Sequence, residues 1–289
     1  MNLNPFHLGG PAFLVFYALL LAGAVVALRR AMRVSETAGV PPPPRFDDPY
    51  LIAWLRGGDA EAVRVATVAL VDRGLLRLEG ERLVLKDPLA LDIVRRDIER
   101  AVLGCFRRPE EAEAADKDAA VRRACKHYRR VLEQHGLVAG RAVLARRLPL
   151  VGLVAAVLLG FSLARAAQAL AAGRSNLSLL AVLSIVAVVV LLAHWLRRRT
   201  FAGDAVLRDL KTLFKRLKDR ASSLRAGAGG NEVAMLAAVF GLSALSAISF
   251  PWVRKLYPPS SKQSSSSSSC GSSCGSSCSG GCGGGCGGE

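Results

Sequence analysis

Cysteine is nearly absent from most of this chain: of seven cysteines, only Cys105 and Cys125 precede residue 270. Histidine is also scarce, and no pair of histidines has the spacing of a helical metal site such as HExxH. A P-loop and a GxSxG nucleophile elbow are both missing. The sequence therefore offers no candidate catalytic group, and we expect that the protein is not an enzyme.

Acidic residues are few as well. The chain of 289 residues has 39 Lys+Arg against 23 Asp+Glu, a formal net charge of +16, and 51% of it is apolar. A basic, hydrophobic chain is typical of a membrane protein with basic flanks or of a nucleic-acid binder. The apolar residues lie in three blocks without charge, 11–28, 148–164 and 177–196. Blocks of this length predict transmembrane helices at 11–28, 148–167 and 177–196, with the bilayer as a partner.

Arginines gather at one end of each predicted span. They precede or follow the blocks at Arg29, Arg30, Arg33, Arg141, Arg146, Arg147, Arg197, Arg198 and Arg199, whereas the opposite ends carry only Arg165 and Arg174. The positive-inside rule then places residues 1–10 outside and the region 29–147 in the cytoplasm. The first block is expected to be a retained anchor, because no Lys or Arg precedes it as in a signal peptide. No charge lies inside the blocks to suggest a transport pathway.

The region between the first two spans predicts a small domain. Residues 29–46 read as a basic, Pro-rich linker, and 47–147 as the cytoplasmic domain. Helices at 47–58 and 59–73 are followed by LLRLEGERLVL, which alternates as a β-hairpin, and this order resembles a winged-helix module. The second helix has more acidic than basic residues, which argues against a nucleic-acid partner and favours a cytoplasmic protein partner for 47–147.

The region after the third predicted span divides into two segments. Residues 200–230 form a basic amphipathic cytoplasmic segment of the kind that is attracted to anionic lipid headgroups. Residues 231–257 contain an uncharged stretch rich in Ala, Ser and Gly. This stretch predicts either a cytoplasmic or surface-lying helix or a fourth span.

The tail, 258–289, is almost entirely Ser, Gly and Cys, and we expect it to be disordered because it has little apolar surface to bury. Its cysteines recur every fourth residue, at Cys270, Cys274, Cys278, Cys282 and Cys286. Flexible spacers would let these thiolates bind a soft ion such as Zn²⁺ or Cu⁺. The alternatives are a low-complexity tail without a ligand and the precursor of an exported Cys-rich peptide.

Several stretches resemble one known family. They are DPYLIAWLRGG at 48–58, LVDRGLL at 70–76, NEVAMLAAVFGL at 231–242 and the Ser/Gly/Cys-rich tail. Together they are similar to a family of uncharacterised bacterial membrane proteins, and the resemblance covers nearly the whole chain. It implies a bacterial inner-membrane location and, from a looser group of relatives, a cytoplasmic place for 231–242. It implies no activity.

These observations predict a multi-pass α-helical membrane protein with a mostly helical, winged-helix-like cytoplasmic domain and a disordered C-terminal tail. The expected function is that of a non-enzymatic, membrane-tethered interaction or scaffolding protein. The alternative is a soft-metal-binding or redox-responsive membrane protein that acts through its tail thiols.

Overall fold

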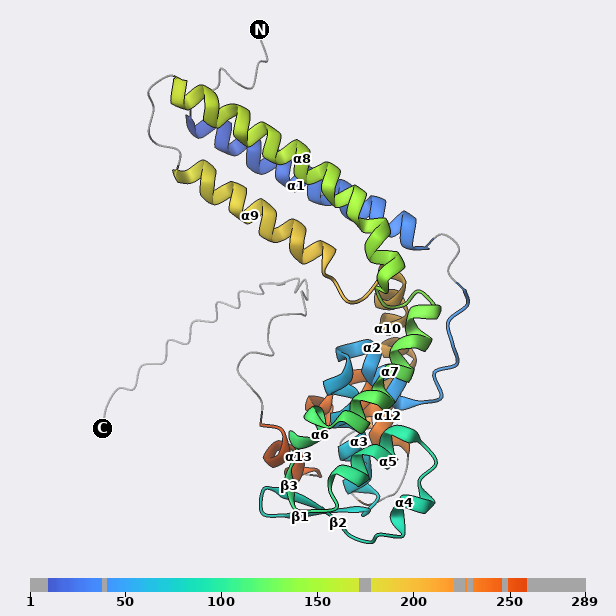
Figure 1. Ribbon diagram of the computed structural model, residues 1–289. Helices are drawn as coiled ribbons and strands as arrows, with labels where there is room; N and C mark the ends of the chain where they lie inside the picture. Colours follow the sequence, from blue (N-terminus) through green and yellow to red (C-terminus); the bar gives the residue numbers. More distant parts are fainter. Residues whose placement is uncertain are drawn as a thin grey trace, which may run out of the picture.

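The computed structural model describes residues 10–37, 41–171, 178–220, 227, 231–245 and 249–258. These residues form a mostly helical molecule with two visibly different parts (Figure 1). Three long apolar helices extend away from a globular part built of shorter helices and one small sheet.

The apolar helix group consists of α1 (Gly10–Thr37), α8 (Arg141–Ala171) and α9 (Ser178–Trp195), which lie side by side (Figure 1). Its small core joins Leu28 and Met32 of α1 to Leu158 of α8 and Leu191 of α9. The Tyr17 hydroxyl donates a hydrogen bond of 3.3 Å to the Leu158 carbonyl oxygen, so α1 and α8 are joined by a polar contact as well.

The globular part begins with two helices at a sharp corner, α2 (Pro49–Gly57) and α3 (Asp59–Asp72). The Asp48 carboxylate accepts a hydrogen bond from the Tyr50 backbone N–H, which caps α2. Gly58 has a φ of 82° at the corner, a conformation that glycine adopts without strain. The two helices pack against each other; α3 buries mainly Ala and Val, whereas α2 buries large side chains such as Tyr50 and Trp54.

A three-stranded antiparallel sheet follows, formed by β1 (Leu76–Glu79), β2 (Arg82–Leu85) and β3 (Glu110–Glu111) in that order. β1 and β2 are a hairpin in which Glu79 pairs with Arg82. The remaining elements surround α2 and α3; they are α4 (Ala90–Ile93), α5 (Asp97–Cys105), α6 (Ala114–Lys117), α7 (Ala119–Gln134), α10 (Phe201–Leu213), α11 (Lys215–Asp219), α12 (Asn231–Phe240), the 3-10 helix η2 (Leu242–Ala244) and α13 (Pro251–Leu256).

Helix α12 lies within the segment 231–257 and is part of the main hydrophobic core, which agrees with neither a fourth span nor a surface-lying helix. Leu236, Ala237, Ala238 and Val239 are fully buried. The helix packs against α2 and α3, and its own alanines allow close approach. At 10 residues it is too short to span a bilayer, and its burial excludes a surface-lying position. The apolar composition that suggested a membrane segment instead serves core packing.

The predicted fold class, a multi-pass membrane protein with three spans, is contradicted. Among the described residues only two helices are long and apolar enough to cross a membrane, Val15–Glu36 and Arg141–Gln168. The third predicted span corresponds to α9 (Ser178–Trp195), whose stretch with described side chains, Ala181–Trp195, is one of the shorter apolar helices in the described part of the chain.

The winged-helix-like part of the predicted fold class is also wrong, although two helices followed by a hairpin do occur in that order. The hairpin gains a third strand, because β2 also pairs with β3 through Arg82 and Glu111. The core of this region includes residues of α10, α12 and α13, which come after the apolar helices in the chain. The predicted disordered tail lies outside the described residues.

A buried ion pair lies where the apolar helix group meets the globular part. Glu36 of α1 and Arg147 of α8 approach to 2.7 Å, and their side chains are 4% and 3% exposed. Arg147 also donates a hydrogen bond of 2.8 Å to the Arg197 carbonyl oxygen, in the segment that follows α9. Glu36 accepts a hydrogen bond from the backbone N–H of Phe201 at the start of α10. This Glu36–Arg147 junction therefore links α1, α8, the segment after α9 and α10.

Candidate anion-binding site

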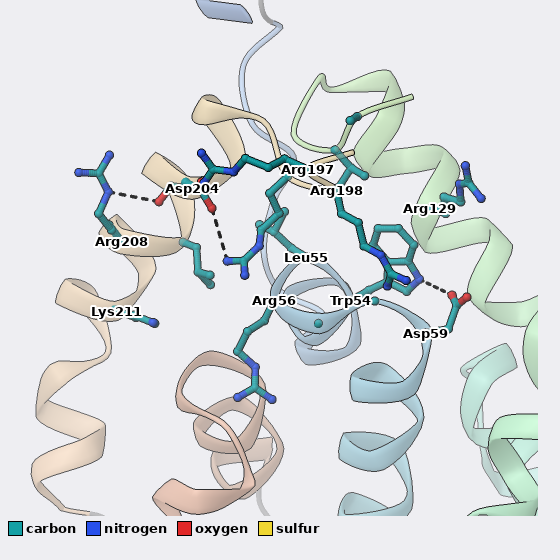
Figure 2. A pocket seen from close by; sticks show the side chains of 16 residues that line it. Trp54, Leu55, Arg56, Asp59, Arg129, Arg197, Arg198, Asp204, Arg208 and Lys211 are labelled. Atoms are coloured by element: carbon teal, nitrogen blue, oxygen red, sulfur yellow. Dashed lines mark hydrogen bonds and ion pairs between the residues drawn. The ribbon is translucent and has the colours of Figure 1, made fainter. Parts of the chain in front are cut away.

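A cavity of about 840 Å³ lies between α2, α7, α10 and the segment 197–199 that follows α9. Trp54, Leu55 and the backbone of Gly57 and Gly58 form one wall. The other walls carry an excess of cations (Figure 2). The basic lining residues are Arg56, Arg129, Arg197, Arg198, Arg199, Arg208 and Lys211, and the acidic ones are Asp59 and Asp204.

The backbone of residues 197–199 is fixed on both sides. The Arg198 carbonyl oxygen accepts a hydrogen bond of 2.8 Å from the Ala139 N–H, and Arg199 pairs with Val138 in an antiparallel bridge. Arg147 donates to the Arg197 carbonyl oxygen from the opposite side. Three consecutive arginines are thus held at the cavity by backbone bonds, which leaves their side chains available for other contacts.

Helix α10 is held close to the same segment. The Thr200 hydroxyl accepts a hydrogen bond from the Gly203 N–H, which caps the helix. A Cβ at Gly203 would overlap the Leu137 carbonyl oxygen, so only glycine permits this approach. Leu207 and Leu210 are buried in the core, and this orientation turns Arg208 and Lys211 to the cavity side of the helix.

Asp204 neutralises part of the positive charge. Its carboxylate lies 2.8 Å from the guanidinium of Arg197 and 3.4 Å from that of Arg199. The other acidic lining residue, Asp59, accepts a hydrogen bond of 2.6 Å from the Trp54 indole N–H. Just outside the lining, Glu61 pairs with Arg56 and Glu133 with Arg129. Even with these four carboxylates, cations remain in excess.

Arg198 and Lys211 contribute most directly to the excess positive charge of the cavity. Among the described residues, neither side chain has a hydrogen-bonding or ion-pair partner. Figure 2 shows Lys211 on α10 and Arg198 on the segment after α9, on different sides of the same hollow. Burial lowers the pKa of Lys211, and the nearby positive charges of Arg199, Arg56 and Lys218 lower it further.

Arg56 is the most enclosed cation of the cavity. Burial lowers its pKa, the Glu61 carboxylate opposes that effect, and the positive charges of Arg199 and Arg64 add to the lowering. Its Nε–H is buried and has no hydrogen-bond partner among the described residues.

Gly58 leaves space for the Arg198 side chain beside the wall of the cavity that contains Trp54. A Cβ at this glycine would lie 3.1 Å from a guanidinium nitrogen of Arg198, and the φ of 82° would strain any other residue. The sequence DPYLIAWLRGG thus supplies Trp54, Arg56 and Gly58 to the lining of the cavity.

The predicted metal ligands, Cys270, Cys274, Cys278, Cys282 and Cys286, lie outside the described residues, so their Zn²⁺ or Cu⁺ binding stays a prediction. Within the described part of the chain, no group of three or more His, Cys, Asp and Glu side chains is arranged to hold a metal ion. Cys125 is fully buried and Cys105 partly so. Burial raises the pKa of the Cys125 thiol to about 12.

Sequence reasoning missed the cavity. It interpreted the three arginines at 197–199 as membrane-flanking charges and Lys211 as part of a basic amphipathic segment. Arg56 and Arg129 had no signal of their own, because they reach the site only when α2 and α7 pack beside α10.

Comparisons of the chain with models of protein families, with curated proteins and with solved structures found no match. The resemblance to a bacterial membrane-protein family therefore stays a prediction.

Proposed function

We propose that this protein is a membrane-tethered, non-enzymatic interaction protein. Helices α1 and α8, with α9 packed beside them, anchor it in the lipid. The globular part, which is built from chain before α8 and after α9, is presented at the membrane surface to a cytoplasmic partner.

The observation that carries this proposal is the exposed apolar surface of α1 and α8. Leu19 of α1 is 68% exposed, and Leu153 and Leu163 of α8 are 67% and 68% exposed. Large apolar side chains on long, adjacent helices need a nonpolar environment, since each costs roughly 1.5–3 kcal/mol when left in water. A bilayer about 30 Å thick matches helices of this length.

A buried core helix and a cleaved signal sequence both fit α1 and α8 less well than a membrane anchor does. A core helix of a soluble protein would be mostly buried, whereas only 17% and 11% of the most apolar windows of α1 and α8 are buried. A cleaved signal sequence would take no part in the mature fold, whereas Glu36 of α1 makes the Glu36–Arg147 junction with α8. Both features favour a retained membrane anchor.

Alkaline carbonate extraction of cell membranes, followed by detergent, tests the proposal on the full chain. We expect the wild-type protein to stay with the membranes in carbonate and to be released by detergent. The double variant Leu153→Arg/Val157→Arg places two charges on exposed positions of α8. It should shift much of the protein to the carbonate-soluble fraction, because each arginine costs roughly 2.5–3.5 kcal/mol within a span.

The matched control is Leu213→Arg. Leu213 is 73% exposed at the end of α10, outside the apolar helices, and this change should leave membrane retention unchanged. Wild-type protein in the carbonate-soluble fraction would overturn the proposal. Equal release of the α8 variant and the α10 control would overturn it as well.

A further inference from the structure

We propose that the basic cavity between α2, α7, α10 and residues 197–199 binds a small anion that carries at least one phosphate group. This inference goes beyond membrane tethering and does not depend on it, because the cavity is formed entirely by the globular part and the segment after α9.

The charge of the cavity sets the charge of its ligand. Arg197 and Arg199 share the Asp204 carboxylate, while Arg198 and Lys211 have no acidic partner among the described residues. Clustered cations raise the energy of the empty site by mutual repulsion, and a multiply charged anion relieves that repulsion. A single carboxylate would compensate only one of these charges, which favours phosphate.

Guanidinium chemistry supports the same choice. Arginine presents a planar fork of donors that matches the oxygens of a phosphate group, and lysine adds a point charge. The cavity offers both types on opposing walls, with Arg198 on one side and Lys211 on the other (Figure 2).

The shape of the site favours a small ligand over a polynucleotide. A volume of about 840 Å³ lies in the range of small-molecule pockets, roughly 300–1,000 Å³. The apolar wall formed by Trp54 and Leu55 provides a contact for the nonphosphate part of the ligand. Single-stranded nucleic acid would instead require an extended groove with several stacking aromatics.

The position of the cavity allows two sources of the phosphate group. Arg197, Arg198 and Arg199 directly follow α9, at the base of the apolar helix group. A lipid headgroup would reach the site along the membrane surface, and a soluble phosphate ester would reach it from the surrounding solution. The cavity would recognise the phosphate group of either source in the same way. A titration with one lipid probe and one soluble phosphate ester distinguishes the two sources.

Calorimetric titration of the full chain, purified in a maltoside detergent, tests the site with three probes. The probes are pyrophosphate, glycerol 3-phosphate and dioctanoyl phosphatidic acid. We expect at least one of them to bind with a Kd below about 1 mM. Binding of phosphatidic acid without glycerol 3-phosphate would support the site and identify a lipid headgroup. Comparable binding of glycerol 3-phosphate would support the site and identify a soluble ester.

Two double variants locate the binding. Arg198→Gln/Lys211→Gln removes the two unpartnered cations and should weaken binding by roughly tenfold or more. Arg254→Gln/Lys255→Gln removes the same charge from exposed positions of α13 and should change binding by less than about twofold. Circular dichroism should show that both variants remain folded, because neither pair has an internal partner among the described residues.

Three outcomes would overturn the inference. The first is that none of the probes binds to the wild-type chain at concentrations up to about 5 mM. The second is an equal loss of binding in both double variants, which would indicate general attraction to a basic protein. The third requires an additional titration with a short DNA or RNA duplex. It is binding of the duplex that is tighter than that of every phosphate probe and that depends on Arg198 and Lys211.

Discussion

Asp116 of α6 shows what a single partly buried carboxylate does to the stability of this protein. Burial raises its pKa, the positive charge of Arg64 opposes the effect, and nearby acidic groups, Glu113 first, add to it. Its Oδ1 atom is buried without a hydrogen-bond partner among the described residues. The folded state therefore binds the Asp116 proton more tightly than the unfolded state, and stability falls as the pH rises above the ordinary value of 3.8.

Replacing Asp116 by Asn removes this cost, so Asp116→Asn should raise the thermal unfolding midpoint at pH 7. The gain should shrink toward pH 4, where the wild-type carboxyl takes up its proton. Thermal melts in detergent at the two pH values measure it. Asp92→Asn, at an exposed position of α4, is the control and should change little. An Asp116→Asn variant that is no more stable than wild type at pH 7 would refute the destabilising role of this carboxylate.

Single residues were only partly predictable from the sequence. Asp59 stands at the first residue of α3, but its side chain caps no backbone N–H there and instead accepts a hydrogen bond from the Trp54 indole N–H. Asp48 caps α2, a local role that the DP dipeptide favours because proline suits the first helical position. Local backbone chemistry is encoded within a few residues, whereas the partner of Asp59 depends on the sharp corner between α2 and α3.

At the scale of elements, the Glu36–Arg147 junction is the strongest polar link between the apolar helix group and the globular part. Removing one charge of a buried pair leaves the other uncompensated. Glu36→Ala should therefore lower the free energy of unfolding by about 3–5 kcal/mol, measured by denaturant or thermal unfolding in detergent. Arg146→Ala, an exposed neighbour on α8, should change it by less than about 0.5 kcal/mol.

The double variant Glu36→Ala/Arg147→Met removes both charges and should be less destabilised than Glu36→Ala alone. If the double variant instead loses the sum of the two single losses, the two side chains do not act as a pair. The sequence did not reveal the junction, because Glu36 and Arg147 lie 111 positions apart and nothing in either local pattern connects them.

Elements differed in how well the sequence predicted them. Two helices and a hairpin at 49–85 follow from local helical periodicity, alternation and Gly80. Helix α12 was misread because its small apolar residues suit a membrane segment and a tightly packed core equally well. Whether this segment is a membrane helix or a core helix depends on its packing against α2 and α3. Because these helices are far away in sequence, the local pattern does not show the packing.

At the scale of the whole molecule, the basic cavity depends on long-range assembly. Its cations come from α2, α7, α10 and the segment after α9, and no short sequence window contains more than a few of them. The net positive charge suggested an anionic partner. Because the sequence also contains long apolar blocks, lipid headgroups were the expected anions. The concentration of charge at one enclosed site could be recognised only after these elements were assembled.

The central claim is that α1 and α8 lie in lipid while the globular part stays outside it. Labelling the native chain in its membrane with a bilayer-partitioned diazirine, followed by peptide mass spectrometry, measures this directly and requires no substitution. The account predicts label on peptides from Val15–Glu36 and Arg141–Gln168, and almost none on peptides from 47–138. Unlabelled α1 and α8, or label spread equally over the globular part, would contradict it.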